Sequence, residues 1–157
     1  MKKYDPGRDS EYAKLARQRL VVGDLFAYDV PVITVMTKGR YYGALSRRVA
    51  TMGVRIPDLA LRCAELVEAE DGKYIFVALW NDENTYSGRH VYDCTRAILR
   101  EARHHRIPEV AMPLLGGNER ARFLGAMEQA VDHAEDEADE AETFMPSVVF
   151  VSDLELL

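Results

Sequence analysis

The residues from Ile107 to Gly117, IPEVAMPLLGG, form the most specific pattern in the sequence. Its apolar run up to Leu115 has the length of a buried strand, and two glycines follow directly. A glycine turn between a strand and a helix lets the backbone approach a diphosphate, and the helix N-terminus then offers free N–H groups. The stretch therefore predicts a strand that ends in an anion-binding loop, although an ordinary tight connection has the same sequence pattern.

Apolar runs on both sides of this stretch predict further strands and helices. Runs of strand length lie at 19–22, 30–36, 73–80 and 147–152. Apolar residues recur at helical spacing over 42–52, 57–68, 85–105 and 119–134. Because strands and helices alternate, the sequence predicts an α/β fold whose mixed or parallel sheet is covered by helices on both faces.

The ends of these strands are where a ligand is expected. In open α/β sheets, ligands bind beyond the carboxyl ends of the strands. This rule selects the segments that follow the strands, namely 23–24, 37–43, 80–84 and 116–120.

Length and composition indicate one domain in a reducing compartment. The chain has 157 residues, which suits a single core, and we treat 1–16 as a polar lead-in and 17–157 as the domain. Cys63 and Cys94 form no secretory framework. The charged start lacks the apolar core of a signal peptide, and no run reaches the roughly 18 apolar residues of a membrane span. We therefore expect a cytoplasmic protein without a membrane partner.

Charge and ligand patterns narrow the function classes. The 20 basic and 26 acidic residues give a net charge of −6, which argues against general nucleic-acid binding. His104 and His105 have no partner at metal-ligand spacing, so we expect no metal site. The acidic stretch 132–142 is typical of a solvated helix end.

Four segments, taken in order, resemble a macrodomain, most closely the branch that includes the human terminal ADP-ribose protein glycohydrolase. They are VGDLFA at 22–27, the segment from Gly43-Ala44-Leu45 to Gly53, DGKYIFVALW at 71–80 with the helix after it, and IPEVAMPLLGG. Together they cover about residues 17–152. The resemblance implies a three-layer α/β/α fold with a mixed, mostly parallel central sheet.

The resemblance also implies a ligand, ADP-ribose or a related nucleotide, and no other cofactor. Asp24 would accept a hydrogen bond from the adenine amino group and Phe26 would flank the base, whereas local sequence allows Asp24 to be a cap and Phe26 a core residue. The loops would hold the phosphates. The expected ligand-binding residues are Asp24, Leu25, Phe26, Thr37, Gly39, Gly43, Ala44, Leu45, Asn81, Leu115, Gly116, Gly117 and Asn118.

The sequence departs from this branch at its catalytic residues. Asn81 stands where the branch has a nucleophilic lysine, and an amide cannot form the adduct that an amine forms. Glu119 falls near the position of the branch's catalytic aspartate. A carboxylate there can activate a water, which makes Glu119 the catalytic candidate, although an acidic residue also suits the first turn of a helix.

Three functions are consistent with these residues. The first is binding of ADP-ribose, with an ADP-ribosylated macromolecule as partner and hydrolysis of the ADP-ribosyl linkage as the candidate reaction. The second is a diverged macrodomain scaffold that acts as a non-catalytic interaction module. The third is a phosphatase acting on ADP-ribose 1″-phosphate, which the same phosphate loops would hold.

Overall fold

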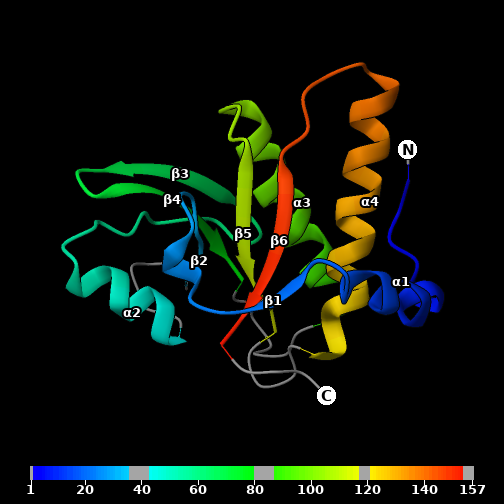
Figure 1. Ribbon diagram of the computed structural model, residues 1–157, viewed down its shortest axis with the longest axis horizontal. Helices are drawn as coiled ribbons and strands as arrows, with labels where there is room; N and C mark the ends of the chain where they lie inside the picture. Colours follow the sequence, from blue (N-terminus) through cyan, green and yellow to red (C-terminus); the bar gives the residue numbers. More distant parts are fainter. Residues whose placement is uncertain (1, 36–42, 80–86, 117–120, 154–157) are drawn as a thin grey trace.

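The computed structural model describes residues 2–35, 43–79, 87–116 and 121–153. Strands and helices alternate along most of this chain (Figure 1). The strands are β1 (Leu20–Val22), β2 (Val32–Val35), β3 (Ala64–Ala69), β4 (Gly72–Ala78), β5 (Glu109–Pro113) and β6 (Ser147–Ser152). The helices are η1 (Pro6–Arg8), α1 (Asp9–Ala16), η2 (Leu25–Ala27), α2 (Gly43–Thr51), α3 (Gly88–His104) and α4 (Leu124–Glu140).

The strands form two three-stranded groups that meet edge to edge. Their orders are β1-β6-β5 and β2-β4-β3. The groups are joined where Pro31 bridges Ala111 in parallel and the Ala111 N–H donates to the carbonyl of Val30. Among the described strands, β3 alone runs antiparallel to its neighbour. The predicted mixed, mostly parallel sheet is therefore confirmed.

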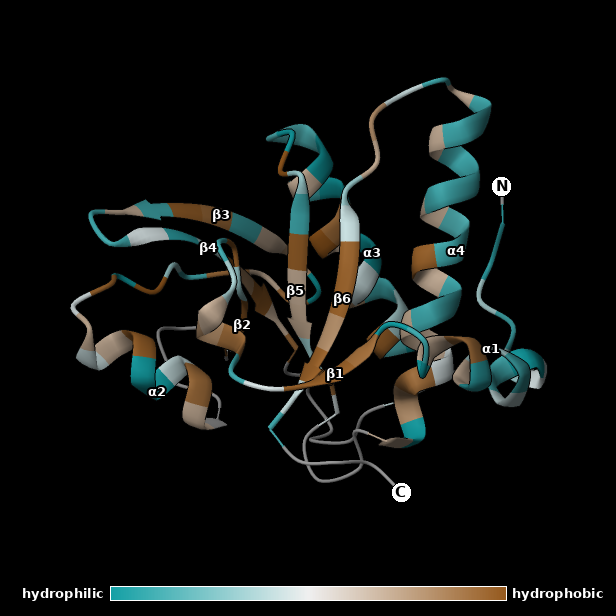
Figure 2. Cartoon of the chain, in the orientation of Figure 1, coloured by the Kyte–Doolittle hydropathy of each residue, from teal (hydrophilic) through white to brown (hydrophobic). Residues whose placement is uncertain are grey.

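Alternate residues of the central strands enter two separate cores, one on each face of the sheet. On β4, Ile75 and Val77 pack with residues of α3 and α4, whereas Tyr74 and Phe76 pack with Val49 of α2. Such alternation follows from the two-residue period of a strand. Figure 2 shows apolar colours along the central strands and polar colours on the outer end of α4. The result is the predicted three-layer α/β/α arrangement.

The helix predicted at 57–68 is wrong, because β3 begins at Ala64. Ala64–Ala69 pairs along its whole length with β4, and Gly72, at φ 148°, closes the turn between them. The apolar spacing of this short segment fits a helix or a strand, and pairing with the neighbouring strand decided the outcome. Cys63 is accordingly exposed rather than on a buried helix face.

The segment treated as a polar lead-in contains α1, which packs against α4 (Figure 1). The Tyr12 hydroxyl donates to Asp132 at 2.8 Å, and the Gln129 side-chain amide donates to the Asp5 carbonyl at the same distance. The helices approach so closely that a β-carbon at Gly125 would stand 2.2 Å from the Asp9 carbonyl oxygen. This glycine therefore permits the contact.

A partly buried ion pair joins Arg19, the residue before β1, to α4. The Arg19 guanidinium donates from Nε to Glu128 Oε2 at 2.8 Å, and the Glu128 side chain is only 6% exposed. Burial raises the pKa of Glu128 even though the Arg19 charge opposes that rise. Arg19 therefore offsets the cost of burying the carboxylate.

The outer edge of β3 carries one polar contact from α3. The backbone N–H of Leu66 donates to Glu101 Oε1 at 2.9 Å. Since β3 pairs only with β4 among the described strands, this N–H faces away from the sheet's own hydrogen bonds.

None of the described helices has the length and apolar character needed to cross a membrane.

Candidate functional site

The parallel strands bring several of the predicted ligand-binding residues to one edge of the sheet. Because β1, β6, β5, β2 and β4 run in the same direction, their carboxyl ends share this edge. Asp24, Leu25 and Phe26 follow β1, Leu115 and Gly116 follow β5, and Gly43, Ala44 and Leu45 begin α2. The remaining predicted residues lie outside the described part of the chain: Thr37, Gly39, Asn81, Gly117, Asn118 and Glu119.

Asp24 caps the short helix η2 and still offers one carboxylate oxygen. Its Oδ1 accepts a hydrogen bond of 3.0 Å from the Phe26 N–H, so the capping role is confirmed. The side chain is 57% exposed. Within the described residues, Oδ2 has no hydrogen-bond partner. Asp24 can therefore cap η2 and accept a hydrogen bond from a ligand at the same time.

Arg48 of α2 lies beside Asp24 and Phe26. The sequence analysis did not predict it as a candidate. Its guanidinium carbon lies 4.1 Å from the centre of the Phe26 ring. Its Nη1 lies 3.4 Å from Asp24 Oδ1. The available signal was the pair Arg47-Arg48 on a short helix, which is weak because surface arginines are usually just solvated.

Three of the residues predicted to contact the ligand have side chains that pack into the protein. Leu25 and Leu115 are buried, and Leu45 is half-buried against the core on the α2 face. Their side chains hold the adjoining loops to the sheet, so a ligand would meet their backbone atoms. Ala44, by contrast, is exposed in the first turn of α2.

Gly116 is the turn residue at the exit of β5. Its φ is +111°, a conformation that side-chain-bearing residues rarely adopt. A β-carbon there would stand 2.3 Å from the Phe123 ring. The helix predicted to start at Glu119 is the described α4, which begins later, at Leu124. A glycine is therefore required at the start of the predicted phosphate loop.

The buried side chain of His90 contacts the backbone at the end of β4. This end of the strand comes shortly before Asn81 in the sequence. His90 Nδ1 accepts a hydrogen bond from Arg62 Nε at 3.3 Å, which leaves Nε2–H to donate to the Leu79 carbonyl. Burial lowers the pKa of His90. The Arg62 N–H also donates to the Ala78 carbonyl at 3.0 Å. These contacts hold the backbone at the end of β4, ahead of Asn81, one of the predicted ligand-binding residues.

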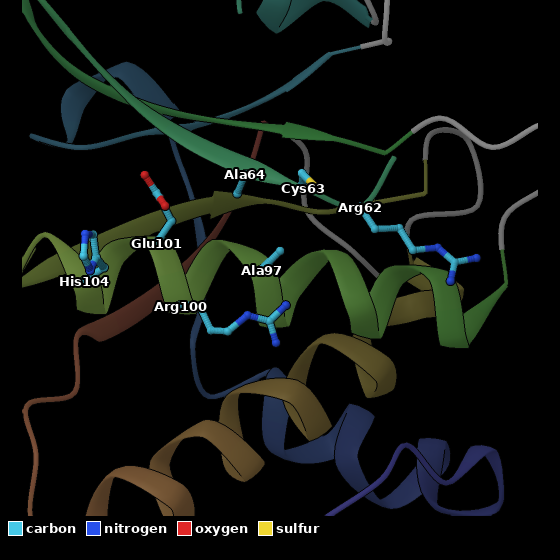
Figure 3. Close-up of a pocket in the computed structure, with 7 residues that line it drawn as sticks. All are labelled: Arg62, Cys63, Ala64, Ala97, Arg100, Glu101 and His104. Carbon is cyan, nitrogen blue, oxygen red and sulfur yellow. The ribbon is translucent and has the colours of Figure 1, made fainter. Parts of the chain in front are cut away.

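A groove of about 440 Å³ lies between β3 and α3, apart from the residues predicted for the ligand (Figure 3). Glu101 points toward β3, where it accepts from Leu66, and Arg62 pairs with Asp93 at 3.1 Å. None of the predicted ligand-binding residues lines this groove. Its lining residues are Arg62, Cys63, Ala64, Ala97, Arg100, Glu101 and His104.

The described residues contain no group of three or more His, Cys, Asp or Glu side chains placed to hold a metal ion. The described residues at the sheet edge can offer hydrogen bonding, stacking and backbone N–H donation. All three suit a nucleotide.

Comparison with known proteins shows which fold this is. No protein-family model matches the chain, and no curated protein matches it in sequence. Solved structures do match. The macrodomain of Thermus aquaticus DarG superposes with a TM-score of 0.62 at 15% identity, over 87% of this chain and 97% of that one. The chain therefore has the macrodomain fold.

Two other structures extend the comparison. The Trypanosoma brucei macrodomain in complex with ADP-ribose gives a TM-score of 0.61 at 10% identity, over 87% of this chain and 64% of that one. An alphavirus protein, P23pro-zbd, gives 0.65 at 14% identity over 86% of this chain. The chain spans only 22% of the length of that viral protein. The fold implied by the four sequence segments is confirmed.

Proposed function

We propose that this protein binds ADP-ribose through the carboxyl edge of its sheet. The observation that carries the proposal is the pairing of Asp24 and Phe26 beside the end of β1, with Asp24 Oδ2 still without a partner among the described residues. A carboxylate oxygen next to an aromatic ring suits a base that carries an amino group. The Trypanosoma brucei macrodomain of the same fold was solved with ADP-ribose.

In this proposal the adenine and the diphosphate of the ligand contact different elements of the fold. Asp24 and Phe26 hold the adenine. The diphosphate lies between the N-terminus of α2, at Gly43 to Leu45, and the loop that Gly116 opens with Gly117 and Asn118. Free N–H groups and the positive end of a helix dipole favour an anion at such a position, regardless of the net negative charge of the chain. Thr37, Gly39 and Asn81 would complete the contacts to phosphate and ribose.

We propose hydrolysis of an ADP-ribosyl linkage as the reaction, with Glu119 as its catalytic residue. Glu119 takes a proton from water while the water oxygen bonds to the anomeric carbon. The bond from that carbon to the modified group breaks, and the proton passes to the leaving group. Asn81 cannot supply an amine nucleophile, which favours direct attack by water. An ADP-ribosylated macromolecule would be the substrate and no further cofactor would be needed.

The two cysteines bear on the cellular location of the protein. Cys63 and Cys94 are both free thiols in the structure. Free cysteines fit a reducing environment, so we propose a cytoplasmic location.

Calorimetry and thermal unfolding with ADP-ribose test the binding proposal. Because a ligand that binds the folded state stabilises it, ADP-ribose should raise the melting temperature of the wild type. Asp24→Ala should weaken binding. Arg55→Ala, which removes a charge at an exposed position beyond α2, should not. If about 1 mM ADP-ribose produces neither heat nor a shift, the ligand assignment is wrong.

A separate assay tests catalysis. The protein is incubated with a glutamate-ADP-ribosylated protein and, in parallel, with ADP-ribose 1″-phosphate. Release of ADP-ribose from the first substrate supports hydrolysis of the linkage, and Glu119→Gln should abolish it. Turnover of the second substrate alone supports the phosphatase. Binding without turnover of either substrate supports a non-catalytic module and overturns the proposed reaction.

A further inference from the structure

The arrangement of Phe26, Asp24 and Arg48 has a consequence for base selection. The three side chains come from two elements that are distant in sequence, η2 and its cap on one side and α2 on the other. The Arg48 guanidinium lies over the Phe26 ring, with its carbon 4.1 Å from the ring centre. At that distance the cation interacts favourably with the ring face.

The Arg48 guanidinium remains accessible to a ligand. The Arg48 side chain is 53% exposed although its guanidinium carbon lies 4.1 Å from the centre of the Phe26 ring. A guanidinium is flat and weakly hydrated, so its exposed surface can receive another flat π-system. Bases stack on arginine planes as well as on aromatic rings.

The same arginine also orients the carboxylate. Asp24 Oδ1 is approached by two donors, the Phe26 N–H at 3.0 Å and Arg48 Nη1 at 3.4 Å. Both donors act on Oδ1, so Oδ2 is the oxygen left for a ligand within the described part of the chain. Arg48 therefore shapes both the flat surface and the acceptor beside it.

We infer that Arg48 is a specificity-determining residue whose guanidinium is the surface on which the ligand's base stacks. The inference rests on the proposed binding of ADP-ribose and refines it: the base contacts Arg48, which selects a large base, and Phe26 supports the guanidinium. A purine has a larger and more polarisable π-surface than a pyrimidine, so it stacks more strongly on a guanidinium. Arg48 should therefore favour a purine even over a pyrimidine that carries an amino group for Asp24.

The test compares ADP-ribose with its cytosine analogue, CDP-ribose, by calorimetry. Both bases carry an amino donor for Asp24, and the change in their difference between the wild type and an Arg48 variant reports what Arg48 contributes. Wild type should prefer ADP-ribose by about tenfold, because the purine stacks more strongly and a single stacked base contributes on that order. Arg48→Ala and Arg48→Lys, the second of which keeps the charge but loses the plane, should weaken ADP-ribose binding by about tenfold and reduce the preference to about twofold. Arg55→Ala is the charge-matched control and should leave both values unchanged.

Each other outcome overturns the inference in a recognisable way. Tighter binding of ADP-ribose by Arg48→Ala would mean that Arg48 competes with the base for Phe26 and Asp24. Equal weakening of both nucleotides by Arg48→Ala, with full recovery in Arg48→Lys, would mean that Arg48 acts through charge alone. If the wild type binds neither nucleotide, the proposed function itself fails and the role of Arg48 fails with it.

Discussion

The ring of Phe123 lies so close to Gly116 that a β-carbon at position 116 would stand 2.3 Å from ring carbon Cδ2. Gly116 also has a φ of +111°. Gly116→Ala therefore combines an unfavourable backbone conformation with a clash and should cost about 2 to 4 kcal/mol of unfolding free energy. Urea unfolding measures it.

Gly53→Ala is the matched control for this substitution. Gly53 ends α2 at φ +82°, and a β-carbon there meets nothing within 4 Å. It should cost only the backbone penalty, about 1 kcal/mol. Equal losses at the two positions would show that Phe123 does not exclude a side chain, whereas partial recovery in Gly116→Ala combined with Phe123→Leu would show that it does.

Removal of one partner of the Arg19–Glu128 pair should cost more unfolding free energy than replacement of both partners by apolar residues. Arg19→Ala leaves the Glu128 carboxylate buried without its partner and should cost about 3 to 5 kcal/mol. The double replacement by methionine removes both charges and should cost much less. Chemical denaturation of the two variants decides the point, and a double variant as unstable as Arg19→Ala would contradict it.

His133 should make the protein sensitive to mild acid. Burial lowers the pKa of His133, and its Nδ1 forms a hydrogen bond of 2.7 Å with the Tyr92 hydroxyl. As the pH falls below the ordinary histidine pKa of about 6.5, the unfolded chain binds a proton that the folded protein resists. Stability is therefore lost on acidification.

His133→Gln isolates this effect. A glutamine oxygen can accept from Tyr92 but does not titrate. Between about pH 7.5 and pH 5.5 the melting temperature of the variant should fall less than that of the wild type. Parallel falls would show that His133 is protonated in the folded protein too.

Asp24→Asn separates the capping role of this side chain from its proposed role in ligand binding. An asparagine caps a helix about as well as an aspartate, so the melting temperature should stay close to that of the wild type. The carboxylate and its attraction for Arg48 are lost. Affinity for ADP-ribose should therefore fall several-fold in calorimetry, since a charged acceptor forms the stronger hydrogen bond. Unchanged affinity would remove Asp24 from the site.

Local sequence was sufficient where one pattern excluded the others. The run SVVFVS predicted a strand at 147–152, which is β6, and Gly53 was predicted to close a helix that ends at Thr51. Long periodicity likewise predicted α3, because the apolar positions of a helix of that length repeat often enough to be distinguished from a strand.

Contacts between distant segments were not predictable from local patterns. The strand β3 depended on pairing with β4, and α1 on packing against α4. Arg48 reaches Asp24 across 24 positions of sequence, and Arg62 reaches His90 across 28. A single sequence carries no signal for such pairs, so Asp24 could be predicted as a candidate from its motif whereas the arginine beside it could not.

The bond from Leu66 to Glu101 bears on how this protein behaves at high concentration. A strand at the edge of a sheet can recruit a strand from another molecule through its unpaired N–H groups. Glu101 satisfies one of those groups internally and places a negative charge where a second chain would have to dock. Glu101→Ala should therefore increase self-association through β3 without touching the proposed ligand-binding edge, and light scattering of the wild type and the variant at equal concentration would show it.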